Sequence, residues 1–315
     1  MDTAARVLLS GIFSSYADNR ELQALTPTDV PDRSKSPDSP GSDSSELWLD
    51  YVADLGDGWN STYTVARLLA ADELDLDWHG ETHATRRGRL LVMGGDQVYP
   101  VPKRAEYENR MLGPYRSAMP CATEDGPELF AIPGSHDWYD GLVNFTSIFC
   151  HGRWIGGWKT RQHRSYFALK LPSGWWLWAI DVQFGAHLDD AQLSYFSEVA
   201  ADQVNEGDRI IVCTAKEVQS GRSTNEIVSD RNLEYLEHEI IEPAGARVVL
   251  HLKSGRHHYC RNVMEDGPRQ HITSGGGGAF LHPTHRLPEE LVIPARPTGS
   301  TGGRASTRLP TSPGS

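Results

Sequence analysis

The chain has 315 residues, of which 38% are hydrophobic and 23% charged, so it can bury a sizeable core and is not a disordered chain. Its 42 acidic and 30 basic residues give a formal net charge of −12, which argues against chain-wide binding to nucleic acid or to an anionic membrane. No run approaches the roughly 20 apolar residues that span a bilayer, so we expect no membrane segment and no nucleic-acid partner.

The two ends of the chain differ in character from its middle. Residues 4–25 have a weak helical pattern, and residues 26–46 are rich in Pro, Ser and Asp, as is the tail from residue 294. Segments of this composition lack the apolar periodicity of a packed element. We therefore divide the chain into an N-terminal helix and loop (1–46), one folded domain (47–293) and a disordered tail (294–315).

Within the domain, short apolar runs alternate with helical patterns. The predicted strands are 47–54, 89–94, 128–132, 165–171, 175–182, 208–214, 246–252 and 270–274, and the predicted helices are 61–75, 103–118, 140–151, 188–203 and 229–242. Strands that alternate with helices indicate an α/β fold with much parallel pairing. The runs 165–171 and 175–182 are separated by only three residues, which predicts an antiparallel hairpin. A mixed sheet, or two stacked sheets, fits this order best.

Polar residues beside a glycine follow four of the predicted strands. These segments are Asp54-Leu55-Gly56-Asp57-Gly58, Gly95-Asp96-Gln97-Val98-Tyr99, Pro133-Gly134-Ser135-His136-Asp137 and Ser254-Gly255-Arg256-His257-His258. In open α/β sheets, ligands bind beyond the carboxyl ends of the strands. Any one of these segments is an ordinary turn, but converging carboxylates and imidazoles at four strand ends favour a metal centre.

In this order the four segments resemble the motifs of the calcineurin-like metallophosphoesterases, and most closely those of their purple-acid-phosphatase-like branch. The resemblance covers about residues 47–285. It implies two stacked mixed sheets flanked by helices, an αββα sandwich, with a dinuclear metal site at the sheet edge. It also implies hydrolysis of a phosphate mono- or diester, on a small molecule or a protein, through a metal-bound hydroxide.

The resemblance implies roles for particular residues. Asp54, Asp96, Tyr99 and His257 match the protein ligands of one metal, and Asp96 matches the carboxylate that bridges two metals. This donor set suits iron, and Mn or Zn remain alternatives. His136 matches the histidine that protonates the leaving oxygen, and Asp137 or another acid would pair with it.

The departures from the motifs fall on the second metal. Ser135 and Gly255 stand where the family has ligands, and the expected histidine after strand 208–214 is absent from the sequence Cys213-Thr214-Ala215-Lys216-Glu217. Glu217, His251 and His258, or Asp137, are candidate substitutes. We expect one firmly bound metal and an uncertain second one. The alternative function is a catalytically weakened relative that binds one metal.

Three further features concern the surroundings of the site and the compartment of the protein. The run Gly275–Gly278 predicts a turn that brings backbone close to the site rather than a nucleotide loop, because the Lys-Ser/Thr of a P-loop is absent. Arg153, Lys159, Arg161 and Arg164 are either anion contacts for the substrate or an exposed loop. The four cysteines are far apart without a CxxC pair, which favours free thiols in a reducing compartment, so we expect a cytoplasmic protein.

Overall fold

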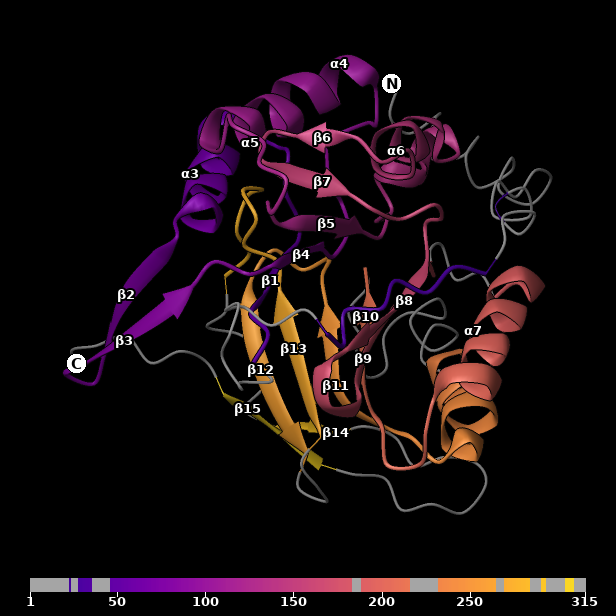
Figure 1. The fold of residues 1–315 in the computed structure, drawn as a ribbon. Helices are drawn as coiled ribbons and strands as arrows, with labels where there is room; N and C mark the ends of the chain where they lie inside the picture. Colours follow the sequence, from indigo (N-terminus) through magenta and orange to yellow (C-terminus); the bar gives the residue numbers. More distant parts are fainter. Residues whose placement is uncertain are drawn as a thin grey trace.

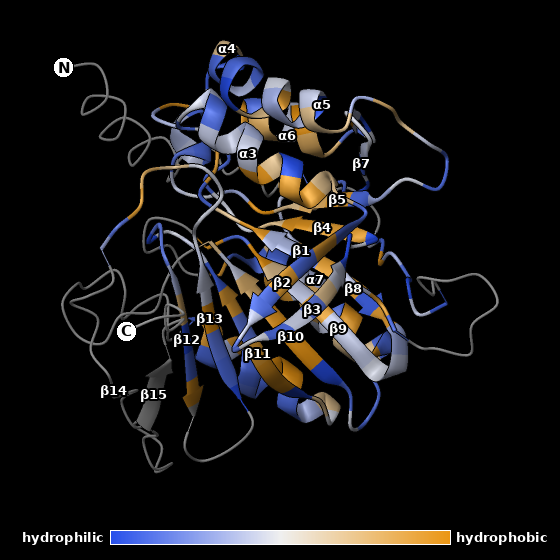
Figure 2. Ribbon diagram, turned by 90° about the vertical axis from the view of Figure 1, so that its left-hand side faces the viewer, coloured by the Kyte–Doolittle hydropathy of each residue, from blue (hydrophilic) through white to orange (hydrophobic). Residues whose placement is uncertain are grey.

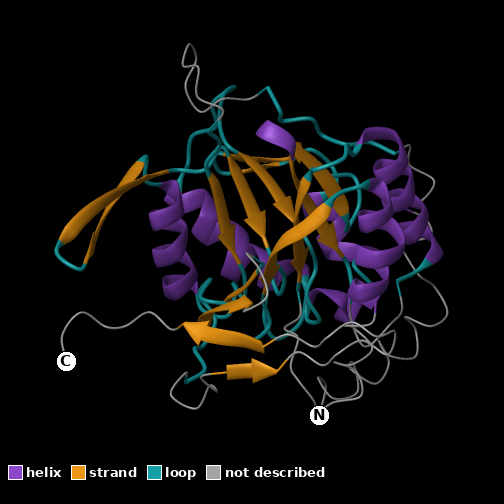
Figure 3. Cartoon of the chain, turned by 90° about the horizontal axis from the view of Figure 1, so that it is seen from below, coloured by secondary structure: helices purple, strands orange, loops and turns teal. Residues whose placement is uncertain are grey.

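The computed structural model describes residues 23, 28–35, 46–182, 188–215, 232–264, 269–283, 290–292 and 304–308. In this part of the chain two β-sheets face each other, and helices cover the outer side of each (Figures 1 and 3). The predicted α/β sandwich is therefore confirmed. One sheet has the order β1 (Leu49–Val52), β4 (Leu90–Met93), β5 (Glu128–Ala131), β7 (Trp158–Thr160) and β6 (Trp154–Ile155).

The second sheet is larger. Its order is β14 (Glu290–Val292), β15 (Arg304–Arg308), β12 (Tyr259–Met264), β13 (Gln270–Ser274), β11 (Arg247–Lys253), β10 (Arg209–Thr214), β9 (Trp175–Ile180) and β8 (Phe167–Leu171). The strands β9, β10, β11 and β13 are parallel, whereas β8 and β12 are antiparallel to their neighbours β9 and β13. The antiparallel hairpin predicted for β8 and β9 is confirmed by its register, in which Leu169 pairs with Leu177.

Alternation along the strands explains why two sheets stack. In β4, Leu90 and Val92 belong to the cluster between the sheets, whereas Leu91 and Met93 pack under the helices. Successive side chains of a strand point to opposite faces, so a strand that is apolar throughout needs cover on both sides. In Figure 2 the strands β4 and β5 are accordingly coloured as mainly hydrophobic.

The helices lie close to their predicted positions. They are α3 (Trp59–Ala70), α4 (Arg104–Tyr107), η1 (Glu108–Leu112), α5 (Gly113–Ala118), η2 (Asp137–Asp140), α6 (Val143–Phe149), η3 (Pro172–Gly174), α7 (Asp190–Gln203), η4 (Glu237–Ile241) and η5 (Glu242–Ala244). Asp189 caps α7 by accepting a hydrogen bond from the Gln192 N–H. No helix of the described residues is long and apolar enough to cross a membrane.

A hairpin of β2 (Glu73–Trp78) and β3 (Glu81–Arg86) replaces the end of the helix predicted for 61–75. The helix ends at Ala70, because Leu74, Leu76 and Trp78 alternate with acids at the period of a strand rather than of a helix. The hairpin projects from the body of the protein (Figures 1 and 3), and Leu76 and Trp78 are exposed on it.

The expectations for the two ends need correction. Within the predicted loop 26–46, residues 31–33 run beside β8: the Arg33 N–H donates to the Lys170 carbonyl at 2.8 Å. Within the predicted tail, strand β15 pairs with β12, so this part is not outside the fold. Apart from Gln23, the predicted helix 4–25 lies outside the described residues. The four cysteines are free thiols.

Candidate metal centre

The loops that follow β1, β4, β5 and β11 meet at one edge of the sandwich. Backbone hydrogen bonds join the first two loops, from the Asp54 N–H to the Gly95 carbonyl (3.0 Å) and from the Leu55 N–H to the Asp96 carbonyl (2.9 Å). Asp54, Asp96 and His257 all have a positive φ, of 57°, 50° and 47°. This left-handed conformation is unfavourable for residues other than glycine and concentrates at functional sites.

The Tyr99 hydroxyl, one of the four predicted ligands of one metal, lies between the other three. Its oxygen is 3.4 Å from Oδ1 of Asp54, 3.1 Å from Oδ2 of Asp96 and 3.1 Å from Nε2 of His257. All four residues are buried. The structure thus brings together, from three loops, residues that are as much as 203 positions apart in the sequence.

The cluster around the Tyr99 hydroxyl lacks positive charge to balance its carboxylates. Nδ1 of His257 lies 2.8 Å from the Phe280 carbonyl, which can only accept, so Nδ1 carries the proton and Nε2 presents a lone pair to Tyr99. With both acids ionised, three acceptors would therefore converge on a hydroxyl that has one proton. Burial, and then the charge of Asp96, raises the pKa of Asp54 to about 8.

A metal cation fits this donor set. Two carboxylates, a phenol oxygen and a neutral imidazole are ligands for Fe, Mn or Zn, and a cation would supply the charge that the three acceptors lack. No three His, Cys, Asp or Glu side chains among the described residues form such a group by themselves. In this cluster the Tyr99 oxygen stands between the two carboxylates and the imidazole, so the tyrosine is an essential member of the set.

Two glycines permit the close packing of backbone on the acids. A Cβ on Gly134 would lie 2.1 Å from Oδ1 of Asp96, and one on Gly275 would lie 2.1 Å from Oδ2 of Asp54. Real Cβ atoms do not approach oxygen so closely, so both positions require glycine. The interpretation of Gly275–Gly278 as a turn that lies against the site is confirmed.

His136 lies beside the cluster with one ring nitrogen held. Its ring centroid is 4.3 Å from that of Tyr99 and 4.9 Å from that of Tyr139, and Nδ1 lies 2.9 Å from the Pro100 carbonyl. The backbone N–H of His136 also donates to Oδ1 of Asp96 at 2.9 Å. This arrangement leaves Nε2, which bonds to no described residue, as the nitrogen that can meet a substrate.

The predicted pairing of Asp137 with His136 is wrong, because Pro100 holds the imidazole instead. The Asp137 carboxylate is buried and accepts hydrogen bonds from the N–H groups of Gln97 (3.1 Å) and Gly134 (2.8 Å) and from the Tyr107 hydroxyl. A buried carboxyl that three donors satisfy has no need of a histidine. Asp137 thus ties the loop that carries Asp96 to the loop that carries His136.

The second half of the expected dinuclear site has few donors. The Gly255 N–H donates to both carboxylate oxygens of Asp54, at 3.1 and 3.0 Å, where the family motif would place a ligand side chain. A Cβ on Gly95 would lie 2.3 Å from the Cβ of Ala215, so the Ala215 methyl packs directly against the Asp96 loop. Among these three positions only Ser135 offers a side-chain oxygen.

The described residues include two of the remaining candidate substitutes for this half, His251 and His258. Glu217 lies outside the described residues. Nδ1 of His258 lies 2.7 Å from the Arg256 carbonyl in its own turn. Leu250 and Leu252 pack between the sheets, so His251 points to the other face, where its ring stacks on that of His271 at 4.5 Å. His251 is therefore excluded as a ligand beside Asp96.

The His251–His271 pair predicts an acid-sensitive fold. Both rings are largely buried, Nδ1 of His251 and Nε2 of His271 have no hydrogen-bond partner in the part of the chain that the structure describes, and burial lowers the pKa of both imidazoles well below the ordinary value. Both must stay neutral in the folded protein, whereas the unfolded chain takes up protons below about pH 6.5. The contribution of this pair to the free energy of unfolding should therefore fall as the pH drops below that value, by about 1.4 kcal/mol per pH unit for each imidazole.

Denaturant unfolding from pH 7 to pH 5 measures this effect. Replacing His271 with glutamine should reduce the dependence on pH, whereas replacing His83, which is exposed on the projecting hairpin, should not. Equal pH dependence in the wild type and the H271Q variant would contradict the assignment.

Two residues of the site were not singled out from the sequence. Phe280 holds His257 through its carbonyl and lies with its ring 4.3 Å from that imidazole. Tyr107 donates its hydroxyl to Asp137. Both come from segments without a motif; the position of Phe280 two residues after the glycine run was the only available signal.

Comparisons with known proteins add little to this geometry. No family model matches the chain, and no curated protein matches its sequence. One solved structure that the chain resembles is described as "GAP50 the anchor in the inner membrane complex of Plasmodium". The two share 15% identity over 75% of each chain, with a TM-score of 0.46. A likeness of this degree identifies no function, so the proposal below depends on the site.

Proposed function

We propose that the protein is a metal-dependent phosphoesterase with one firmly held metal. The observation that carries the proposal is the convergence of three acceptors, from Asp54, Asp96 and His257, on the single proton of Tyr99. When bound, an iron, manganese or zinc ion would supply a Lewis acid that polarises a phosphoryl oxygen and lowers the pKa of water.

In this proposal His136 supplies the proton to the leaving oxygen. The Pro100 carbonyl accepts from Nδ1 and so fixes the proton there, which leaves Nε2 to take up a proton from solvent and donate it. The rings of Tyr99 and Tyr139 restrict rotation of the imidazole. Asp137 keeps the loops of Asp96 and His136 in register.

The substrate class is a phosphate mono- or diester on a small molecule or a protein, and a cytoplasmic location remains part of the proposal.

A second candidate function is a catalytically weakened protein that binds one metal. The replacement of ligands by Gly255 and by the packed Ala215 methyl favours it. A lone metal cannot clamp both the attacking and the leaving oxygens, so turnover would be slow. Hydrolysis of p-nitrophenyl phosphate and bis(p-nitrophenyl) phosphate by the metal-loaded protein separates the two functions: turnover that the D96N variant lacks supports the esterase, and tight metal binding without turnover supports the alternative.

We expect one metal per chain after purification. Ser135, Ala215 and Gly255 stand where the family has ligands of the second metal, and only Ser135 has a side-chain donor. A second ion would therefore have too few ligands. Elemental analysis of the purified protein measures the ratio, and titration with Mn²⁺ measures any weak second site. Two tightly held metals per chain, with a rate that ignores added metal, would show that other residues complete the second half.

A further inference from the structure

A cavity of about 410 Å³ lies between residues 29–33 and the edge of the five-stranded sheet. It is lined by Asp29, Val30, Pro31, Asp32, Arg33, Gly152, Thr160, Arg161 and His163. It adjoins the beginning of β5, at Glu128, whereas the candidate metal centre follows the other end of that strand. The cavity is therefore separate from the metal centre, and the basic residues beside it are not contacts of that centre.

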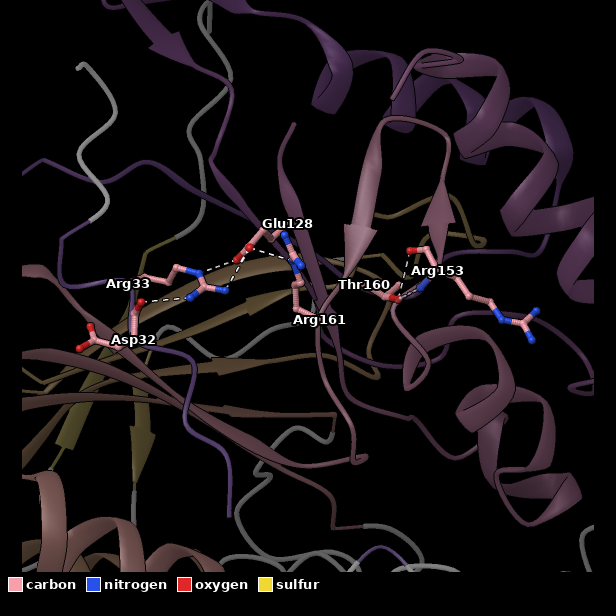
Figure 4. A network of polar contacts seen from close by, with 6 residues as sticks. All are labelled: Asp32, Arg33, Glu128, Arg153, Thr160 and Arg161. Carbon is pink, nitrogen blue, oxygen red and sulfur yellow. Dashed lines mark hydrogen bonds and ion pairs between the residues drawn. The ribbon is translucent and has the colours of Figure 1, made fainter. Parts of the chain in front are cut away.

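One carboxylate at this cavity is shared by two guanidinium groups. Oε2 of Glu128 accepts from Nε of Arg33 at 2.5 Å, and Oε1 accepts from Nη2 of Arg33 at 3.0 Å and pairs with Nε of Arg161 at 2.9 Å (Figure 4). The Glu128 side chain is only 16% exposed. Glu128 thus binds both guanidinium groups, and since the carboxylates of Asp29 and Asp32 also line the cavity, an anion would be held by the free guanidinium nitrogens of Arg161 rather than by a net positive charge.

Arg161 has donors to spare. Its Nε binds Glu128, but its two terminal nitrogens bind no described residue, and the side chain is 40% exposed. His163, which also lines the cavity, makes no hydrogen bond with a described residue. A guanidinium fork binds the oxygens of a carboxylate or phosphate in pairs, so Arg161 and His163 form an oxyanion-binding wall.

Asp29 gives the same cavity an acidic wall. Its carbonyl accepts from the Tyr195 hydroxyl at 3.2 Å, but its carboxylate has no partner among the described residues. The neighbouring Asp32 carboxylate is occupied by the Ser34 N–H at 2.8 Å. A ligand that satisfies both walls has an oxyanion at one end and hydroxyl donors at the other.

We propose that this cavity binds a small phosphate ester that carries hydroxyl groups, of the sugar-phosphate class. The phosphate lies at Arg161 and His163, and a hydroxyl donates to Asp29. Ligand cavities of small molecules have volumes of about 300–1,000 Å³, which includes this one. The site acts independently of the metal centre and of the proposed hydrolysis.

Calorimetric titration of the full chain with glucose 6-phosphate tests the proposal. The R161Q variant should raise Kd about 10- to 100-fold, the loss expected for a charged hydrogen-bonding partner. The R153Q variant is the matched control, because Figure 4 shows the Arg153 side chain pointing away from Arg161, and its Kd should equal that of the wild type. Because phosphate monoesters are also the proposed substrates of the candidate metal centre, the titration is repeated with the D96N variant, in which this cavity should keep the same Kd.

Three probes test the chemistry of the ligand. Glucose should not bind, inorganic phosphate should bind more weakly than glucose 6-phosphate, and the D29N variant should weaken the sugar phosphate but not inorganic phosphate. Malate that binds as tightly as glucose 6-phosphate would overturn the phosphate assignment. An unchanged Kd in the R161Q variant, loss of binding only in the D96N variant, or no binding of glucose 6-phosphate at millimolar concentration would overturn the site. The unfolding temperature confirms that R161Q folds, and R161K should recover part of the affinity.

Discussion

On the proposed function, replacing Asp96 with asparagine should abolish metal binding and the hydrolysis that depends on it. Asp96 accepts from the Tyr99 hydroxyl through Oδ2 and from the His136 N–H through Oδ1, so it joins the candidate ligands to the candidate acid. Asparagine keeps an oxygen for the His136 N–H and tolerates the left-handed conformation at φ 50°. The substitution therefore removes the charge and leaves the backbone in place.

The same substitution should not destabilise the metal-free protein. The charge of Asp96 contributes to the raised pKa of Asp54, so the metal-free protein keeps two buried acids close together at a cost. The metal-free D96N variant should unfold at a temperature no lower than that of the metal-free wild type. Elemental analysis and thermal unfolding measure the two effects.

Asp57, in the loop that carries Asp54, provides a matched control. Its carboxylate lies 3.6 Å from Nη1 of Arg110 and is 41% exposed. The D57N variant should keep the metal and the rate of hydrolysis. Wild-type metal content in D96N would show that the cluster around Tyr99 is not the metal site.

Replacing His136 with alanine should lower kcat about 10²- to 10⁴-fold, the usual effect of losing a general acid. The metal content should not change, because the imidazole binds Pro100 rather than any of the four candidate ligands. The loss should be smallest for substrates with good leaving groups such as nitrophenolate, which leave without protonation, and largest for alkyl phosphates.

Rates on an aryl and an alkyl phosphate, measured for the wild type and the H136A variant, test this assignment. The H83Q variant is the control for loss of a histidine, since His83 is exposed on the projecting hairpin. An equal loss on both substrates would argue against proton donation by His136. A loss of metal in H136A would show that the histidine acts on the cluster instead.

The elements whose signal is local were predictable. The strands β4, β5, β9 and β10 are continuous apolar runs, and the end of each run could be placed within two residues. The short strands β6 and β7, the strands β12, β14 and β15 at one side of the larger sheet, and the hairpin β2–β3 were missed. Their residues are few or polar, and their pairing depends on neighbours that are distant in the sequence.

The candidate site shows the same division. The position of polar residues at strand ends predicted a metal centre at one edge of the sheet, and the resemblance to the metallophosphoesterase motifs implied Asp54, Asp96, Tyr99 and His257 as one set of ligands. The partner of His136 was not predictable. Its partner is the carbonyl of Pro100 in another loop. Every residue has a backbone carbonyl, so no residue type in the sequence indicates this contact.

By itself, the sequence determined the α/β class, the main strands in their order along the chain, and the four residues of the cluster, which are Tyr99 and the three residues that surround its hydroxyl. These follow from periodicity and from residue types at strand ends, which are local properties of the chain. The tertiary structure alone decided that Asp137 ties two loops together, that His251 faces away from Asp96, and that Arg33 and Arg161 share Glu128. Each of these depends on which face a side chain takes and on what packs against that face, and both are set only when distant segments come together.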